Sequence, residues 1–375
     1  MNSKPHTKFI VIFSGFNQRA VVAFLRTLEM RKIDNYFILA SCDSDPILNT
    51  TYQHKVFKIR KNKNLDKIEL IKLINEAKKH YNSGSMLIAP TTEALNRFLL
   101  KYREELENNG WIIPLVDKST YETISDKRLF WNLCQNKKLL VPQTFPCFQK
   151  FEHPYVAKPN NYQSTTSGII YSPILVHNKK EHSNFINTYP KTDFTFYEYV
   201  KGRSYYLLFY FGKFGNIKKF SQENLAQQFE GKSIIAAISS TIHKENICTQ
   251  YETLFKEINY HGFVMVELRK NHNGYYMIEA NPRFWGPSQL LINCNTAFFE
   301  EFLYDYGFLK KCYQKELNGS YFWSGGLKGR TLDETSCVFY GNGLSYIKSR
   351  IEDFKKNDIY SKSDTIHIYE SEKNN

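Results

Sequence analysis

The segment that decides the fold is residues 263–281, with the sequence FVMVELRKNHNGYYMIEAN. Two runs of apolar and aromatic residues flank a short polar stretch, a pattern typical of a β-hairpin. A loop over residues 272–274, with its glycine last and in the left-handed conformation, makes Asn271 face Tyr275 across the two strands. The sequence therefore predicts how the two strands are aligned.

This alignment brings two acidic side chains together. Because side chains alternate between the two faces of a strand, Glu267 lies directly opposite Glu279, and Asn281 shares their face. The other face is wholly apolar and is expected to enter a core, with Val264, Val266, Leu268, Tyr276, Ile278 and Ala280.

Opposed carboxylates repel, which costs up to about 1 kcal/mol even in solvent. A divalent cation between them would offset this cost, and the oxygen ligands Glu267, Glu279 and Asn281 suit Mg²⁺ or Mn²⁺. A hairpin loop of two or four residues would instead shift the register and separate the acids. Turn chemistry alone leaves both alternatives open.

The first third of the chain alternates short apolar runs with helical patterns. Strands are expected at residues 9–13, 36–40, 54–59, 86–89 and 111–115, and helices at residues 18–30, 65–81 and 93–106. Such alternation indicates an open, mainly parallel α/β sheet. The turn at residues 14–17 holds a single glycine and no GxGxxG pattern, which argues against dinucleotide binding.

The remaining chain has a different, α+β pattern. Strands are expected at residues 155–159, 169–171, 194–200, 205–211, 263–269 and 275–280, and helices near residues 119–128, 249–258 and 344–354. Small polar side chains fill residues 160–168, which predicts a mobile loop between two strands. The pattern weakens from about residue 310, where a C-terminal appendage is expected.

Composition excludes several classes of protein. No apolar run approaches the length of a membrane span, and the polar first eight residues do not form a signal peptide, so we expect a cytoplasmic protein without membrane partners. The net charge of +13 is dispersed, and its densest cluster, residues 58–63, reads as a solvated loop rather than a nucleic-acid patch. The seven cysteines lack metal-ligand spacing, which argues against zinc.

The sequence around the second acid is the most specific motif. Residues 276–286, YMIEANPRFWG, together with Glu267 twelve residues before Glu279, resemble the metal-binding signature of the ATP-grasp superfamily. Three segments that resemble other motifs of this family precede it in the expected order, at residues 125–127, 156–159 and 196–202. Together these motifs cover residues 119–313.

The resemblance implies a division of the chain into four parts. Residues 1–118 would form the parallel α/β domain that precedes the ATP-grasp fold in this family. Residues 119–202 and 203–312 would form two α+β subdomains that clasp ATP, the first with the phosphate loop and the second with the metal hairpin. Residues 313–375 would form an appendage packed on the ATP-grasp domain.

The resemblance also implies roles for individual residues. Glu267, Glu279 and Asn281 would bind Mg²⁺ (or Mn²⁺) that bridges ATP phosphates, and Arg283 and Lys158 would stabilise the transferred phosphoryl group. The residues implied in nucleotide binding are Lys127 and Lys158 on phosphate oxygens, the loop Gln163, Ser164, Thr165, Thr166, Ser167 and Gly168, and the adenine contacts Glu198, Tyr199 and Val200. Ser204 departs from the family, whose members often carry an acid there for the ribose.

The function implied is a ligase that uses Mg·ATP to convert a carboxylate into an acyl phosphate and joins it to an amine, releasing ADP and phosphate. A carbamoyl-phosphate-synthase-like enzyme, a ligase with a hydroxyl acceptor and a non-catalytic ATP-binding module are alternatives. The expected partners are small-molecule carboxylates and amines, and binding to nucleic acid is not expected. The protein could also form a homodimer. The expected substrate pocket comprises Arg203, Gln222, Glu223, Arg269, Phe284 and Trp285.

Overall fold

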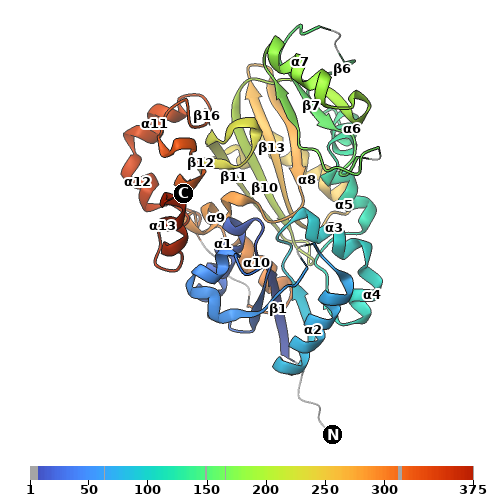
Figure 1. The fold of residues 1–375 in the computed structure, drawn as a ribbon, viewed down its shortest axis with the longest axis vertical. Coiled ribbons are helices and arrows are strands. Elements are labelled where there is room, and N and C mark those ends of the chain that lie inside the picture. The colour runs from blue at the N-terminus through green and yellow to red at the C-terminus, as the bar shows by residue number, and fades with distance from the viewer. Residues whose placement is uncertain (1–6, 63, 148–149, 165, 311–314, 375) are drawn as a thin grey trace.

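Three β-sheets organise the part of the chain that the computed structural model describes, residues 7–62, 64–147, 150–164, 166–310 and 315–374 (Figure 1). A five-stranded parallel sheet lies near the N-terminus, and a four-stranded antiparallel sheet lies at the opposite end of the molecule. A seven-stranded antiparallel sheet lies between them. The expected parallel α/β region followed by α+β regions is confirmed.

The parallel sheet has the strand order β3-β2-β1-β4-β5. Its elements are β1 Thr7–Phe13, α1 Gln18–Met30, β2 Tyr36–Ala40, β3 Val56–Ile59, α2 Lys67–Tyr81, β4 Ser83–Ile88, α3 Glu93–Lys101, α4 Arg103–Asn108 and β5 Trp111–Ile112. Ile10 and Ile12 share a core with α1, whereas Val11 and Phe13 share one with α2. Because both faces of β1 are buried, its sequence is a continuous apolar run. The helix expected at residues 93–106 is divided at Tyr102, whose backbone leaves the helical conformation.

The four-stranded sheet has the order β6-β9-β7-β8. The elements of this region are α5 Lys118–Ser125, α6 Lys127–Asn136, β6 Thr144–Phe145, β7 Tyr155–Pro159, β8 Ile174–Val176, α7 Lys179–Thr188 and β9 Phe194–Glu198. The prediction of a strand at residues 169–171 is wrong, and β8 occupies that place in the sheet. The carbonyl oxygen of Ile169 instead accepts a hydrogen bond from the amide of Ser164, so this backbone closes the preceding loop.

The seven-stranded sheet has the order β14-β13-β10-β11-β12-β15, with β16 paired to β11. Its strands are β10 Arg203–Phe211, β11 Ile217–Gln227, β12 Ile234–Ser239, β13 Gly262–Asn271, β14 Gly274–Asn281, β15 Ser320–Phe322 and β16 Val338–Phe339. The helices that pack around it are α8 Asn246–Glu257, α9 Gln289–Asn293 and α10 Phe298–Asp305. The sequence gives no apolar pattern for β11 because polar residues, among them Gln222 and Asn224, are fully buried in it.

The hairpin of β13 and β14 confirms the predicted pairing but not the predicted turn. Asn271 pairs with Gly274, so the loop has two residues rather than three. A β-bulge at Ile278 then shifts the register by one residue and places Glu267 opposite Glu279.

The bulge also changes which side chains enter the core. Met277, rather than Tyr276 or Ile278, packs with Leu268 and Val266, because each residue between the turn and the bulge lies on the face opposite to the one predicted.

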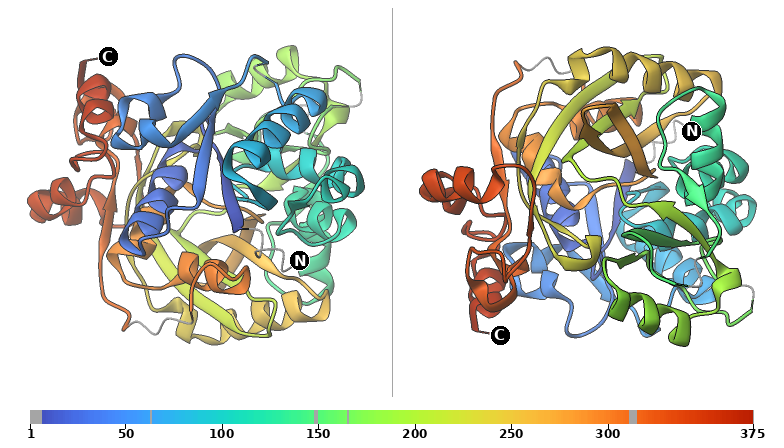
Figure 2. Two further views of the ribbon diagram at one scale, coloured as in Figure 1. Left: turned by 90° about the horizontal axis from the view of Figure 1, so that it is seen from below. Right: turned by 90° about the horizontal axis from the view of Figure 1, so that it is seen from above.

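The C-terminal residues contact two parts of the molecule. They contain α11 Gly343–Ser349, α12 Ile351–Lys356 and α13 Ile366–Asn374, and the helix expected at residues 344–354 is interrupted at Arg350. Figure 2 shows these helices, in red, along one side of the molecule. Strands β15 and β16 extend the large sheet, whereas Asp364 binds Arg26 of α1 at 2.7 Å. None of the described helices is long and apolar enough to cross a membrane.

Arg26 fixes the C-terminal residues to the parallel domain. Its guanidinium donates to Asp364, to the Gln289 side chain at 2.7 Å and to the Ile359 carbonyl oxygen at 2.8 Å, and its side chain is 8% exposed. Arg26→Ala would leave a half-buried carboxylate without its cation, so we expect a loss of about 3 kcal/mol in the free energy of unfolding, measured in urea.

The matched control is Arg350→Ala, which removes an exposed ion pair with Asp353 and should cost less than about 0.5 kcal/mol. Equal losses for the two variants would contradict the role of Arg26.

Candidate functional site

A cavity of about 430 Å³ is lined by residues from both antiparallel sheets and from the start of α1 in the parallel domain. Its lining includes Asn17 and Arg19 just after β1, Lys158 on β7 and Tyr206 on β10. The structure brings together in this cavity most of the predicted nucleotide and metal residues, namely Lys127, Lys158, Glu198, Tyr199, Val200, Glu267, Glu279, Asn281 and Arg283.

Each of the two opposed acids has its own cation. Glu267 is 5% exposed, and its Oε1 lies 2.9 Å from the Nη2 of Arg269. The Oε2 of Glu279 lies 3.9 Å from the Nζ of Lys127, and its Oε1 accepts a hydrogen bond of 2.8 Å from Asn281. The Oδ1 of Asn281 accepts in turn from Arg283 at 3.2 Å. The repulsion expected between opposed carboxylates is therefore offset by guanidinium and ammonium groups.

The pKa values of the two acids are shifted in opposite directions. Burial raises the pKa of Glu267, with the nearby Glu279 charge acting in the same direction, although Arg269 and Lys158 oppose this rise. Burial also acts to raise the pKa of Glu279, but Lys127 and the hydrogen bond from Asn281 outweigh it, so that this pKa is lowered. Both acids therefore depend on neighbouring positive charge to stay ionised.

Two carboxylates and one amide make a donor set of oxygen atoms only. Glu267 and Glu279 face each other from paired strands, and Asn281 follows on the same face. This set fits a hard divalent cation such as Mg²⁺, which takes few protein ligands and keeps positions for water and phosphate oxygens. Among the described residues, no group of three or more His, Cys, Asp or Glu side chains forms another candidate metal site.

The bulge in β14 also positions a lysine. The carbonyl oxygen of Ile278 accepts a hydrogen bond of 2.5 Å from the Nζ of Lys158, which is 7% exposed. Burial, together with the charges of Lys127 and Arg269, lowers the pKa of Lys158 to about 8, although Glu279 favours its charged form. An anionic ligand in this cavity would therefore find a lysine with little hydration to lose.

The start of helix α6 determines the position of Lys127. Asp126 caps α6 by accepting hydrogen bonds from the amides of Arg128 and Leu129, so Lys127 occupies the first turn of the helix. Its ammonium group brings positive charge to the cavity.

The cavity has an apolar part beside the connection between β9 and β10. Val156, Leu175 and Ile278 line this part together with Tyr199 and Val200. A flat aromatic ring would fit such surroundings, and the adenine contacts remain a prediction.

Backbone hydrogen bonds limit what this connection can offer a ligand. The amide of Glu198 donates to the carbonyl oxygen of Gln143 at 2.8 Å, so this amide is already used within the protein.

The predicted phosphate loop lies apart from the cavity lining. Ser164 and Thr166 donate to Asp193 at 2.5 and 2.9 Å, and Gln163 donates to the carbonyl oxygen of Gly168 at 2.7 Å. Thr165 lies outside the described residues, and the other predicted loop residues, Gln163, Ser164, Thr166, Ser167 and Gly168, are not among the lining residues. Closure of this loop over phosphates remains a prediction.

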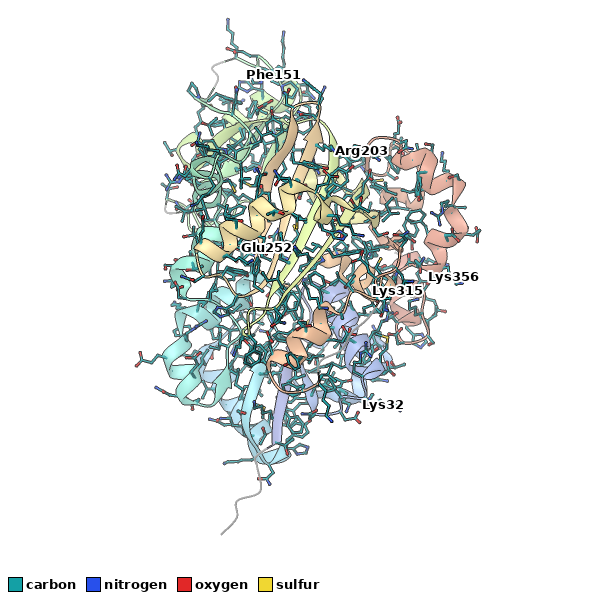
Figure 3. The ribbon with its side chains drawn as sticks, turned by 180° about the vertical axis from the view of Figure 1, so that it is seen from behind. Lys32, Phe151, Arg203, Glu252, Lys315 and Lys356 are labelled. Atoms are coloured by element: carbon teal, nitrogen blue, oxygen red, sulfur yellow. The ribbon has the colours of Figure 1, made fainter. Side chains whose placement is uncertain are left out.

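Four of the residues expected in the substrate pocket do not line the cavity. Arg203 pairs with Glu223 at 2.6 Å, at an end of the large sheet that Figure 3 shows near the C-terminal helices. Gln222 is buried and donates to Asn224, and Phe284 packs in the core against Phe263 and Phe299. Arg269 and Trp285 are the two expected pocket residues that do line it.

Sequence reasoning missed the contribution of the parallel domain. Arg19 of α1 lines the cavity and donates to Ser233 at 2.7 Å and to the Ile234 carbonyl oxygen at 3.1 Å. The strand order reverses at β1, and ligands of open α/β sheets bind outside the carboxyl ends of strands at such a point. The turn after residue 13 was therefore the feature of the sequence that could have predicted this contribution.

The C-terminal residues also support the cavity. The guanidinium of Arg269 lies 4.4 Å from the centre of the Tyr340 ring and donates to its hydroxyl at 2.6 Å, and both groups contact Gln227. The amino-acid pattern around Tyr340 contains no hint of this long-range contact.

Comparisons with known proteins find similarity in structure but not in sequence. No protein-family model matches the chain, and no curated protein matches its sequence. N5-carboxyaminoimidazole synthetase from Staphylococcus aureus complexed with ADP has a TM-score of 0.61 and 13% identity, over 95% of this chain and 100% of that chain.

Two further solved structures have the same fold over most of their length. The L-amino acid ligase from Bacillus licheniformis has a TM-score of 0.58 and 15% identity, over 84% of this chain and 76% of that chain. The biotin carboxylase–βγ-ATP complex from Campylobacter jejuni has a TM-score of 0.58 and 14% identity, over 83% and 74%. The likeness to these three structures confirms the expected ATP-grasp fold.

Proposed function

We propose that this protein is a ligase that uses Mg·ATP to activate a carboxylate as an acyl phosphate and transfers the acyl group to an amine. The observation that carries this proposal is the convergence of the opposed acids Glu267 and Glu279 with Lys127, Lys158 and Arg283 in one cavity. The structural neighbours support it, since they include an L-amino acid ligase and a synthetase complexed with ADP.

Glu267, Glu279 and Asn281 would hold Mg²⁺, or Mn²⁺, at the hairpin. The cation supplies positive charge that neutralises phosphate oxygens as the phosphoryl group moves. Arg269 would then give up part of its contact with Glu267, and it can do so because Tyr340 and Gln227 already accept its hydrogen bonds.

The protein's own residues would position the nucleotide and the reacting groups. The apolar part near Val200 would take the base, which directs the phosphates toward Lys127 and Lys158. Arg283, held by Asn281 and by the Phe284 carbonyl oxygen at 2.9 Å, would face the terminal phosphate. Phosphoryl transfer requires this kind of positioning and positive charge, and it needs no protein nucleophile.

The reaction would proceed in two steps. A carboxylate oxygen of the substrate attacks the γ-phosphorus, and the bond between that phosphorus and the β–γ bridging oxygen breaks to release ADP. The nitrogen of the amine then attacks the acyl carbon, inorganic phosphate leaves with the bonding electron pair, and the amine loses a proton to solvent. The positive groups named above would surround the terminal phosphates, which favours this route over attack on the α-phosphorus.

Glu279→Gln is expected to reduce turnover by at least about 100-fold, because it removes a charged ligand from a preorganised site. ADP release, screened over mixtures of carboxylates and amines, measures this turnover. Glu257→Gln, which changes an exposed acid paired with Lys137, is the matched control and should keep normal turnover. Near-normal turnover of Glu279→Gln at limiting Mg²⁺ would refute the metal assignment.

The products test the chemistry separately. We expect ADP and phosphate in equal amounts, and an acyl phosphate that hydroxylamine traps when the amine is withheld. Arg283→Ala should abolish this trapping while changing the Kd for ADP by less than about threefold, and Arg283→Lys should rescue poorly because a point charge cannot reproduce a two-pronged grip on phosphate. Stoichiometric AMP and pyrophosphate would overturn the mechanism.

A further inference from the structure

A second cavity, of about 450 Å³, lies in the C-terminal part of the chain and shares no described lining residue with the first. Residues from β15 to α13 form it, and its wall is largely apolar, with Phe322, Leu327, Leu332, Ile351 and Tyr369. A volume of this size is typical of sites for small molecules. Nothing in the proposed ligase reaction uses it.

One carboxyl group faces this apolar wall. Glu372 lines the cavity, and both of its carboxylate oxygens lie 3.2 Å from the indole nitrogen of Trp323, which donates to them. A side chain at Gly325 would collide with this carboxyl group, because a Cβ there would lie 1.9 Å from its Oε2. Glycine at position 325 thus leaves space for this acid in the cavity lining.

The surrounding charges leave this acid without a cation in contact. Among the described residues Glu372 forms no ion pair, and the guanidinium of Arg19 stacks over the face of the Trp323 ring, 3.9 Å from its centre. Burial and the nearby Asp358 raise the pKa of Glu372 to about 7, while the Trp323 hydrogen bond and Arg19 oppose the rise. A half-buried carboxylate of this kind would gain from a cationic partner.

Three exposed lysines, Lys348, Lys355 and Lys373, complete the lining. Lys355 is paired with Glu352 at 2.9 Å, and the Nζ of Lys373 lies 4.1 Å from the centre of the Tyr369 ring. These ammonium groups oppose any cationic ligand, and water screens them only in part, so two positive charges would be disfavoured more than one. Attraction to Glu372 must outweigh this opposition, which favours a ligand with a single ammonium group and an apolar body.

We propose that this cavity binds a small molecule with an apolar body and one ammonium group, the ammonium on Glu372 and the body against the apolar wall. The two cavities share no described lining residue, and Trp323, which donates to Glu372, should report occupancy of this one by a change in fluorescence.

The test uses the full chain, saturated with Mg·ADP, and 2-phenylethylamine as the probe at pH 8. We expect saturable binding by calorimetry and by tryptophan fluorescence, and at least about tenfold weaker binding of the neutral 2-phenylethanol and of the anionic 3-phenylpropanoate. Equal affinity for the amine and the alcohol, or no saturable amine binding, would overturn the proposal.

Two variants and a control assign the binding to this cavity. Glu372→Gln and the cavity-filling Leu332→Trp should each weaken amine binding at least about tenfold, whereas Glu370→Gln, an exposed acid on the same helix, should not. Melting temperatures verify that each variant folds. Amine binding in the first cavity, as an acceptor substrate, would survive Glu372→Gln, and that outcome would refute this site while leaving the ligase proposal intact.

The pH dependence gives an independent check. The ammonium binds the ionised carboxylate, so at pH 6, below the pKa of about 7, Glu372 must first lose a proton. The Kd for 2-phenylethylamine should therefore be about tenfold higher at pH 6 than at pH 8, where the probe is still protonated. A Kd that does not change between these two pH values would contradict the role of Glu372.

Discussion

The opposition of Glu267 and Glu279 on paired strands is the constraint on which the rest of the site depends. Two like charges at this separation repel strongly away from water, so the fold must bring positive groups to them. Arg269 comes from the same strand as Glu267, whereas Lys127 comes from α6 and Lys158 from the four-stranded sheet. Three separate parts of the chain must therefore pack together before positive groups balance the charges of the acids. The site can form only when the whole fold is in place.

A single β-bulge in β14 allows the acids to face each other despite the two-residue turn. The two-residue loop after Asn271 would by itself misalign the acids, and the extra residue at Ile278 restores their alignment. The same bulge exposes the carbonyl oxygen that holds Lys158. The pairing inferred from the sequence was thus correct although the turn assumed for it was wrong, because turn statistics do not register a bulge further along the strand.

Prediction from the sequence succeeded where local pattern decides structure. Apolar runs and helical periodicity placed most elements of the parallel domain, and two apolar runs around a polar turn predicted the hairpin. It failed where long-range contacts decide: β11 is buried but polar, Ile169 is apolar but exposed, and Arg19 and Tyr340 reach the cavity from distant parts of the chain. No local signal separates such residues from ordinary surface positions.

The proposed function requires that the paired acids bind a divalent cation together with a nucleotide. Electron paramagnetic resonance of Mn²⁺ titrated into the protein with ADP measures this binding directly. We expect Mn²⁺ affinity to rise when ADP is present, and Glu267→Gln to weaken it at least about tenfold while the protein keeps its melting temperature. Unchanged Mn²⁺ affinity in Glu267→Gln with ADP bound would contradict the account.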